Sequence, residues 1–272
     1  MERRGGAPVA GGARISDTPG HVSAGHSNPR IRQQSPGGAT IRHGRSGLSP
    51  IEGSGSGRAK PQPRKLYSRA VGLEQVRQAY ASVAGLYIEL FGSSERVHAD
   101  DLAFIERHLG GRPGVVLDLG CGPGHLTGFL RSLGVDARGI DLVPEFIAHA
   151  RAAHPSGRYQ LGSMEDLGVA DHSIAGILTW YSLIHLPPRR LDGVLARFRR
   201  AMAPGGRLVL GVFDGDEVAA FDHKVITAYR WPVDELVERL TRAGFVEVER
   251  LRRPDEDNHR PHAAVAAVAT EG

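Results

Sequence analysis

The stretch that decides the fold is Val115 to Leu130, which reads VVLDLGCGPGHLTGFL. Its apolar run ends in Asp118, and glycines then occupy every second position, at Gly120, Gly122 and Gly124. A short apolar run bounded by glycines is typical of a buried strand, and the residues that follow suit a helix. Glycines at such a turn let backbone N–H groups approach a polar ligand. The stretch therefore predicts a buried parallel strand, a tight turn and a helix N-terminus that together bind a ligand.

Strands and helices alternate along the chain after this stretch. We expect strands at residues 115–119, 137–141, 158–161, 174–181, 207–213, 245–251 and 264–269. We expect helices at 73–91, 99–109, 124–133, 144–153, 189–202 and 233–243. The last two strands have no helix between them, so they must pair antiparallel. The prediction is an α/β fold, a doubly wound Rossmann-like seven-stranded sheet with an antiparallel last strand.

The first 66 residues differ in composition from the rest of the chain. They hold 11 Lys and Arg against 3 Asp and Glu, whereas the remainder holds 23 against 27, so the basic excess belongs to this segment. A segment rich in Gly, Pro, Ser and Arg buries too little apolar surface to offset the entropy of ordering. We predict a disordered tail at 1–66 and one domain at 67–272, with an N-terminal helical lid at about 71–110. A dispensable or non-native start, a transit peptide and a basic arm remain open as roles for the tail.

Composition also bears on location and partners. Cys121 is the single cysteine, so no internal disulfide can form, which fits a reducing compartment. No apolar run approaches the roughly 18 residues of a membrane span, and no apolar segment follows the early arginines as in a secretory signal. The mildly acidic domain counts against a partner whose phosphates must be neutralised. We expect a cytoplasmic protein with no membrane span and no stable nucleic-acid partner.

The identity of the ligand depends on Asp141, which ends the second predicted strand, twenty-one residues after Gly120. A carboxylate there can accept hydrogen bonds from both hydroxyls of a ribose, in a dinucleotide or in S-adenosyl-methionine (SAM). The dinucleotide fingerprint needs its third glycine at the position of His125, whereas here that glycine is Gly124. Asp118, before the turn, is placed to receive the ammonium of an amino-acid moiety. These features favour SAM.

The motif D-L-G-C-G-P-G at 118–124, with I-D-L at 140–142, resembles the class I SAM-dependent methyltransferases, in particular their small-molecule, methyltransferase type 11/25-like branch. The resemblance covers about residues 74–270. Further segments resemble the family's adenine-contact, acceptor-facing and fifth-strand segments, namely G-S-M-E-D-L at 162–167, W-Y-S-L-I-H-L-P-P at 180–188 and A-P-G-G-R-L-V-L at 203–210.

The resemblance implies SAM as cofactor and a set of residues that contact it. These are Tyr80, Asp118, Gly120, Cys121, Gly122, Asp141, Leu142, Ser163, Met164 and Glu165. Ser163 departs from the family pattern, since many members carry there an acid that bonds the adenine amino group; Glu165, Asp166 or backbone groups are the substitutes. Tyr80 and Tyr87 are open between a core role and a lid over the cofactor.

The acceptor side is expected around the end of the fourth strand. His185 is either a general base, since the unperturbed pKa of histidine lies near neutrality, or a wall of the pocket. Tyr181 is a candidate for a polar contact there. Acids and a histidine follow the fifth strand, but their spacing matches no metal-ligand pattern, so no metal is expected.

The resulting hypothesis is a methyltransferase that moves the SAM methyl group to an O, N or C nucleophile of a small-molecule acceptor. A nucleic-acid methyltransferase of the same fold is an alternative, although Trp180-Tyr181-Ser182-Leu183 lacks the Asp/Asn-Pro-Pro-aromatic motif typical of base amino methylation. A non-catalytic SAM-binding regulatory module and a dinucleotide oxidoreductase also remain open.

Overall fold

The computed structural model describes residues 72–254 and 260–271. The predicted tail at 1–66 lies outside these residues. The predicted boundaries of the domain and of its lid therefore stay predictions.

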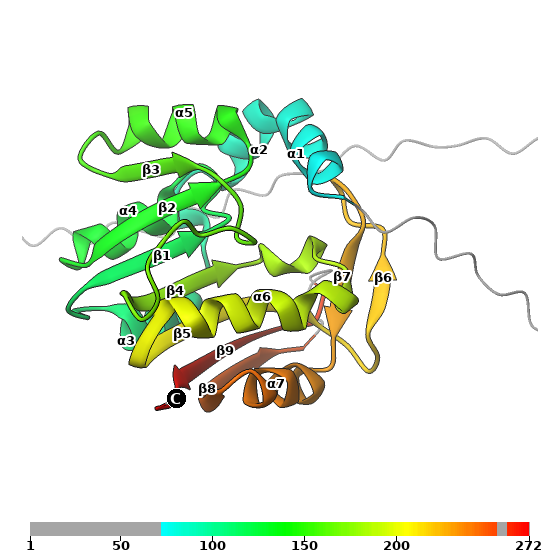
Figure 1. The fold of residues 1–272 in the computed structure, drawn as a ribbon. Helices are drawn as coiled ribbons and strands as arrows, with labels where there is room; N and C mark the ends of the chain where they lie inside the picture. The colour runs from blue at the N-terminus through cyan, green and yellow to red at the C-terminus, as the bar shows by residue number, and fades with distance from the viewer. Residues whose placement is uncertain (1–71, 255–259, 272) are drawn as a thin grey trace, which may run out of the picture. The chain divides into compact units, whose positions relative to one another are not determined.

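A mixed sheet of nine strands forms the centre of the described residues (Figure 1). Across the sheet the order is β3, β2, β1, β4, β5, β7 and β6, with β9 also paired with β5 and β8 paired with β9. The strands are β1 (Val115–Leu119), β2 (Asp136–Asp141), β3 (Arg158–Leu161), β4 (Ile174–Trp180), β5 (Met202–Asp214), β6 (Ala219–Phe221), β7 (Ala228–Trp231), β8 (Phe245–Arg253) and β9 (His262–Ala269).

The first five strands pair in parallel and confirm the predicted doubly wound arrangement. Strand β1 is central, and it is apolar because both of its faces are covered. Its Val116 packs on one face of the sheet, whereas Leu117 and Leu119 pack on the other. The carboxyl ends of these strands meet at one edge, where α/β sheets bind ligands.

The predicted antiparallel end is also confirmed. Strand β9 pairs antiparallel with β5 from Arg207, opposite Val268, to Phe213, opposite His262, and β8 pairs antiparallel with β9. The predicted number of seven strands is wrong, because β6 and β7 join the sheet. Strand β7 pairs with β5 only at Phe213 and Asp214. Strands of three and four residues are too short to show an alternating pattern in sequence.

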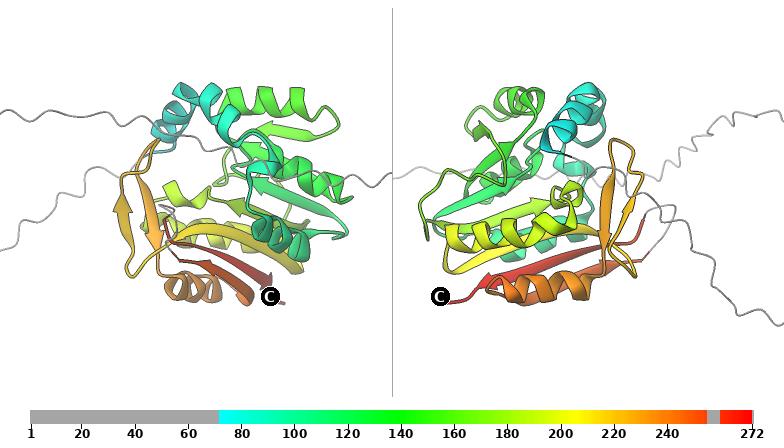
Figure 2. Two further views of the ribbon diagram at one scale, coloured as in Figure 1. Left: turned by 180° about the vertical axis from the view of Figure 1, so that it is seen from behind. Right: turned by 45° about the vertical axis from the view of Figure 1, so that its right-hand side comes forward.

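Helices cover both faces of the sheet (Figures 1 and 2). Phe104 of α3 and Leu130 of α4 belong to the core on one face, and Phe198 of α6 and Leu236 of α7 to the core on the other. The helices are α1 (Leu73–Ser82), α2 (Ala84–Phe91), α3 (Ala99–Leu109), α4 (His125–Ser132), α5 (Pro144–Ala153), α6 (Pro188–Ala201) and α7 (Val233–Arg242), with short 3₁₀ helices η1 (Ser94–Arg96) and η2 (Leu183–His185).

The predicted helix at 73–91 is two helices, α1 and α2, which meet at Val83. Val83 leaves the helical region, with φ −119° and ψ 11°. A β-branched residue followed closely by Gly85 is a weak point in a helix, so a small packing gain is enough to break it there. The break lets Tyr80 and Tyr87 both pack against Phe146 of α5, with ring centroids 6.1 and 5.2 Å from it.

Candidate functional site

The glycine turn after β1 has a backbone that other residues would strain. Gly120, Gly122 and Gly124 have φ values of 74°, 52° and 88°. A Cβ on Gly120 would lie 2.4 Å from Cβ of Ser182. The turn is fixed to β2, since the N–H groups of Gly120 and Cys121 both donate to the Ile140 carbonyl, at 2.7 and 3.1 Å.

Asp141 closes the other side of the turn. Its Oδ2 accepts from the Gly122 N–H at 2.8 Å, and its Oδ1 accepts from the Val143 N–H at 2.9 Å. Burial raises the pKa of this carboxyl, and the backbone N–H groups oppose the shift. These bonds fix the carboxylate at the wall of a cavity, while each oxygen keeps a lone pair for a ligand hydroxyl.

Asp118 lies deeper and does not line the cavity. Its side chain is 1% exposed and accepts a hydrogen bond of 2.6 Å from the Thr127 hydroxyl on α4. Burial raises the pKa of Asp118 to about 7, against the effect of that bond. Cys121 is likewise buried, packed with Ile147 and Tyr159. The predicted cofactor contacts of Asp118 and Cys121 stay predictions.

In the segment after β3, Met164 lines the cavity, whereas Ser163 and Glu165 do not. The Ser163 hydroxyl accepts from the Glu165 N–H at 3.1 Å. Glu165 forms an ion pair with Arg190 of α6 through Oε2. Its Oε1 is buried and has no hydrogen-bond partner within residues 72–254 and 260–271. An orphaned carboxylate oxygen at this place would accept from a ligand amino group.

His185, in η2, is held from two sides. Nδ1 lies 2.9 Å from the Thr227 carbonyl oxygen, which can only accept, so Nδ1 carries the proton. Nε2 therefore accepts from the Tyr80 hydroxyl, 2.8 Å away on α1. Burial lowers the pKa of His185 to about 4; the Thr227 carbonyl opposes this shift and His223 adds to it. The ring is neutral, and the lone pair that a general base would use is occupied.

Tyr181 follows β4 with a φ of 51°. Among the described non-glycine residues only His172 shares a positive φ. The strain is maintained by a hydrogen bond from the Tyr181 N–H to the Gly211 carbonyl and by ring contacts with Trp180 and Phe213, whose centroids lie 5.6 and 5.3 Å away. Strained backbone of this kind concentrates at functional sites.

These groups surround a cavity of about 100 Å³. The structure brings together at this cavity the predicted residues Tyr80, Gly120, Gly122, Asp141, Leu142, Met164, Tyr181 and His185. Sequence reasoning missed Phe146 and Arg190 as wall residues. Phe146 lies on the predicted helix that follows Asp141, so its place after that strand was a usable signal. No sequence signal pointed to Arg190, because its position at the cavity depends on how α6 packs on the sheet.

Neither a membrane span nor a metal site is found in the part of the chain that the structure describes. No helix there is long and apolar enough to cross a bilayer. No group of three or more His, Cys, Asp or Glu side chains within it is arranged to hold a metal ion.

Residues 116–206 match a family model described as a methyltransferase domain. The chain is 34% identical over 102 residues to a malonyl-[acyl-carrier protein] O-methyltransferase of Pectobacterium atrosepticum, covering 37% of this chain and 39% of the relative. It is 28% identical over 166 residues to the protein of that name from Erwinia billingiae, covering 61% and 62%. An uncharacterized methyltransferase of Synechocystis is 31% identical over 132 residues, covering 48% and 60%. The chain thus spans less than two thirds of each of these relatives.

Solved structures share the fold. A 1,6-didemethyltoxoflavin-N1-methyltransferase of Burkholderia thailandensis superposes with a TM-score of 0.60 at 24% identity, covering 72% of this chain and 88% of that one. The [4+2]-cyclase SpnF superposes with a TM-score of 0.62 at 17% identity, covering 73% and 96%. At such identities these structures support the fold, while the domain match and the relatives support the family. The chain thus contains a methyltransferase domain at residues 116–206 and has the fold of SAM-dependent methyltransferases.

Proposed function

We propose that this chain transfers the methyl group of SAM to an O, N or C nucleophile of a small-molecule acceptor. The observation that carries the proposal is the pairing of the glycine turn with Asp141, whose carboxylate is fixed on the Gly122 and Val143 N–H groups at the cavity wall. A carboxylate held in this way accepts the two hydroxyls of a ribose without having to be reoriented.

Other groups around the cavity fit the rest of the cofactor. Glu165 does not line the cavity, but it is paired with Arg190, which does; if the Glu165 side chain turned toward the cavity, its unpartnered Oε1 would accept from the adenine amino group, the family role that Ser163 cannot fill. Tyr80, Tyr87 and Phe146 supply an aromatic cover. SAM, when bound, supplies a methyl group on a positively charged sulfur.

Methyl transfer is an in-line displacement, so the protein mainly positions two reactants and excludes water. Trp180 and Tyr181 wall the acceptor side, and His185 ties α1 to the sheet edge through Tyr80. We assign His185 a positioning role, because its Nε2 holds the Tyr80 proton in place and its pKa of about 4 makes it a weak base at neutral pH.

The cofactor must enter through the lid. The cavity of about 100 Å³ is well below the roughly 300–1,000 Å³ of pockets that enclose drug-sized ligands. Entry therefore requires α1 to move away from the sheet edge, and this breaks the bond between Tyr80 and His185. The same bond would re-form over the bound cofactor and exclude water.

The proposed acceptor class takes support from the relatives. A structural neighbour is named for N1-methylation of 1,6-didemethyltoxoflavin, a free small molecule, and two relatives are named for O-methylation of a malonyl group carried on acyl carrier protein. The neighbour SpnF, a [4+2]-cyclase, favours a second candidate, in which the same fold serves a reaction other than methyl transfer.

Transfer of radiolabelled methyl from SAM into a cell extract distinguishes the candidates. The extract is separated into small-molecule, protein and nucleic-acid fractions after incubation with the protein. The proposal expects label in the small-molecule fraction, and less of it with Asp141→Ala. Label in the protein fraction would favour an acyl acceptor carried on a protein over a free small molecule, and label in the nucleic-acid fraction would favour the alternative acceptor. Cofactor binding with no label in any fraction would favour the second candidate.

A further inference from the structure

A second cavity, of about 490 Å³, opens at the carboxyl end of β5. Its lining residues come from the end of β5 and the turn after it, from β6 and β7, from the end of β8 and from the segment just before β9. We call it the arginine cavity, because its wall includes Phe213, Phe221, Arg230, Arg252, Arg253 and Arg260. Four arginines around one cavity contrast with the rest of the domain, where acids outnumber bases.

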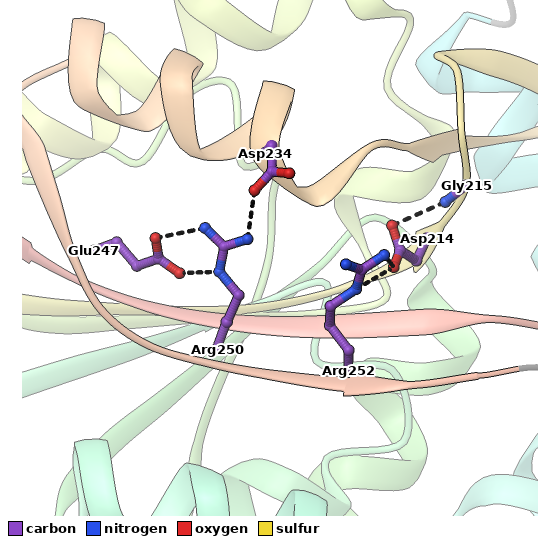
Figure 3. A network of polar contacts seen from close by, with 6 residues as sticks. All are labelled: Asp214, Gly215, Asp234, Glu247, Arg250 and Arg252. Atoms are coloured by element: carbon purple, nitrogen blue, oxygen red, sulfur yellow. Dashed lines mark hydrogen bonds and ion pairs between the residues drawn. The ribbon is translucent and has the colours of Figure 1, made fainter.

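Two acids also line this cavity, and one of them is already neutralised. Asp214 is 7% exposed; its Oδ2 accepts from Nε of Arg252 at 2.8 Å and its Oδ1 from the Gly215 N–H at 2.9 Å (Figure 3). Asp216 is exposed. Two of the four wall arginines are thus paired with acids, Arg252 with Asp214 and Arg253 with the buried Asp101 of α3, which leaves Arg230 and Arg260 as the candidates to bind an anion.

Arg250, two residues before Arg252 on β8, is an arginine whose guanidinium is already paired with two carboxylates. Figure 3 shows its guanidinium between Glu247 and Asp234, with hydrogen bonds to both carboxylates. Arg250 is not part of the cavity wall. Substitution of Arg250 is therefore a control for substitution of the arginines in the cavity wall, since Arg250 is the same residue type and lies on β8, as Arg252 does.

Arg230 and Arg260 both line the cavity and are less fully paired than Arg252 and Arg253. The contact of Arg230 with an acid is a long one, 3.4 Å to the exposed Glu217, and its buried Nε has no hydrogen-bond partner in the described residues. Arg260 lies over the Phe221 ring, 4.5 Å from its centroid, and forms no ion pair with any described residue. A buried donor without a partner costs free energy, and an oxyanion offers what guanidinium groups bind best.

A single aromatic layer separates the arginine cavity from the cofactor cavity. Tyr181 lines the cofactor cavity, and its ring lies 5.3 Å from that of Phe213, which lines the arginine cavity. On the same layer, His223 lies 5.5 Å from His185 and 5.8 Å from Phe213 between ring centroids. A small molecule with its acidic group at the arginines would therefore reach the transfer site only if Tyr181 and Phe213 moved apart.

We propose that the arginine cavity binds the carboxylate or phosphate group of the methyl acceptor, and this rests on the proposed function. The acceptor is then an anionic small molecule with an aromatic or apolar part against Phe213 and Phe221. Arg230 and Arg260 supply the donors for the oxyanion. Arg252, whose charge is offset by Asp214, forms part of the wall beside them.

Binding of three probes to the full-length protein tests this proposal. Phenyl phosphate and benzoate carry the two candidate anions on one ring, and benzyl alcohol is the neutral comparison. We expect at least one anion to bind at least roughly ten-fold more tightly than benzyl alcohol, and the stronger of the two identifies the anion. Arg230→Gln and Arg260→Gln should each weaken that binding several-fold, Arg250→Gln should leave it unchanged, and Asp216→Asn should strengthen it.

Equal binding of all three probes would overturn the proposal, as would an Arg250→Gln effect as large as that of Arg230→Gln. Binding of S-adenosyl-homocysteine is measured on every variant and reports on the cofactor cavity alone. If the arginine variants lose the anion but keep S-adenosyl-homocysteine, the proposal holds. If wild type binds the anion but not S-adenosyl-homocysteine, the proposed function fails and the anion site stands.

Discussion

The Tyr80 hydroxyl donates a hydrogen bond of 2.8 Å to Nε2 of His185, across 105 positions of the chain. The bond joins the lid helix α1 to the segment after β4, at the mouth of the cofactor cavity. Under the proposed role of α1 as a lid, opening of the cavity breaks this bond.

Tyr80→Phe removes this bond and keeps the ring. We expect the free energy of unfolding to fall by about 1 kcal/mol, because His185 Nε2 is left without a donor. Dissociation of S-adenosyl-homocysteine, followed by stopped-flow fluorescence, should be roughly five-fold faster, the rate equivalent of that energy. Tyr87→Phe is the control, since its hydroxyl has no hydrogen-bond partner within the described residues. Equal dissociation rates for the two variants would exclude the role of Tyr80 as a latch.

The neutral state of His185 predicts a pH dependence of stability. Its pKa falls from 6.5 to about 4 on folding, so between these values the unfolded chain binds a proton that the folded protein does not. The free energy of unfolding therefore decreases as pH drops from 6.5 to 4, by up to about 1.4 kcal/mol per pH unit from this residue.

Urea unfolding of wild type and His185→Asn across this range measures the effect. The variant should have a flatter profile. His125, whose pKa burial also lowers to about 4, contributes equally to both proteins and cancels in the difference. Parallel profiles would show that His185 is not held neutral.

Alanine substitutions at Gly120 and Gly134 distinguish two costs to the free energy of unfolding, that of a steric clash and that of a left-handed backbone conformation. Both glycines have positive φ, 74° and 80°, but a Cβ on Gly134 would meet nothing within 4 Å, whereas one on Gly120 would lie 2.4 Å from Cβ of Ser182. Gly134→Ala should cost about 1–2 kcal/mol for the left-handed conformation alone.

Gly120→Ala should cost about 1–3 kcal/mol more, and it should also weaken binding of S-adenosyl-homocysteine. Thermal unfolding and titration calorimetry on both variants check this. A Gly120→Ala protein as stable as Gly134→Ala would mean that the turn tolerates a side chain there.

The sequence predicted the parallel part of the fold because β1 and β4 are apolar runs and because β1, β2 and β4 are each followed by a turn and a helix. It did not predict β6 and β7, since the short runs at 219–221 and 228–231 carry no periodic signal and pair only where β5 extends past β4. The break at Val83 was missed for a related reason. Packing of two tyrosines on Phe146, rather than local propensity, decides where the helix ends.

The part of the site that could be predicted from the sequence is the part formed by residues close together in the chain. The glycine turn and Asp141 lie on neighbouring strands, and their spacing fixes their contact. The bond between Tyr80 and His185 and the ion pair between Glu165 and Arg190 join segments that are distant in sequence. No spacing rule connects such residues, because their approach depends on how helices pack over the sheet edge.

Titration of S-adenosyl-homocysteine into wild type, Asp141→Ala and Asp136→Ala tests the central claim most directly. Asp136 is the control, a carboxylate at the other end of β2 that is paired with Arg138. We predict binding to wild type and Asp136→Ala with similar affinity, and a loss of about 1–3 kcal/mol for Asp141→Ala in a protein that still unfolds cooperatively. Binding of NADH in place of S-adenosyl-homocysteine, or equal affinities for all three proteins, would contradict the account.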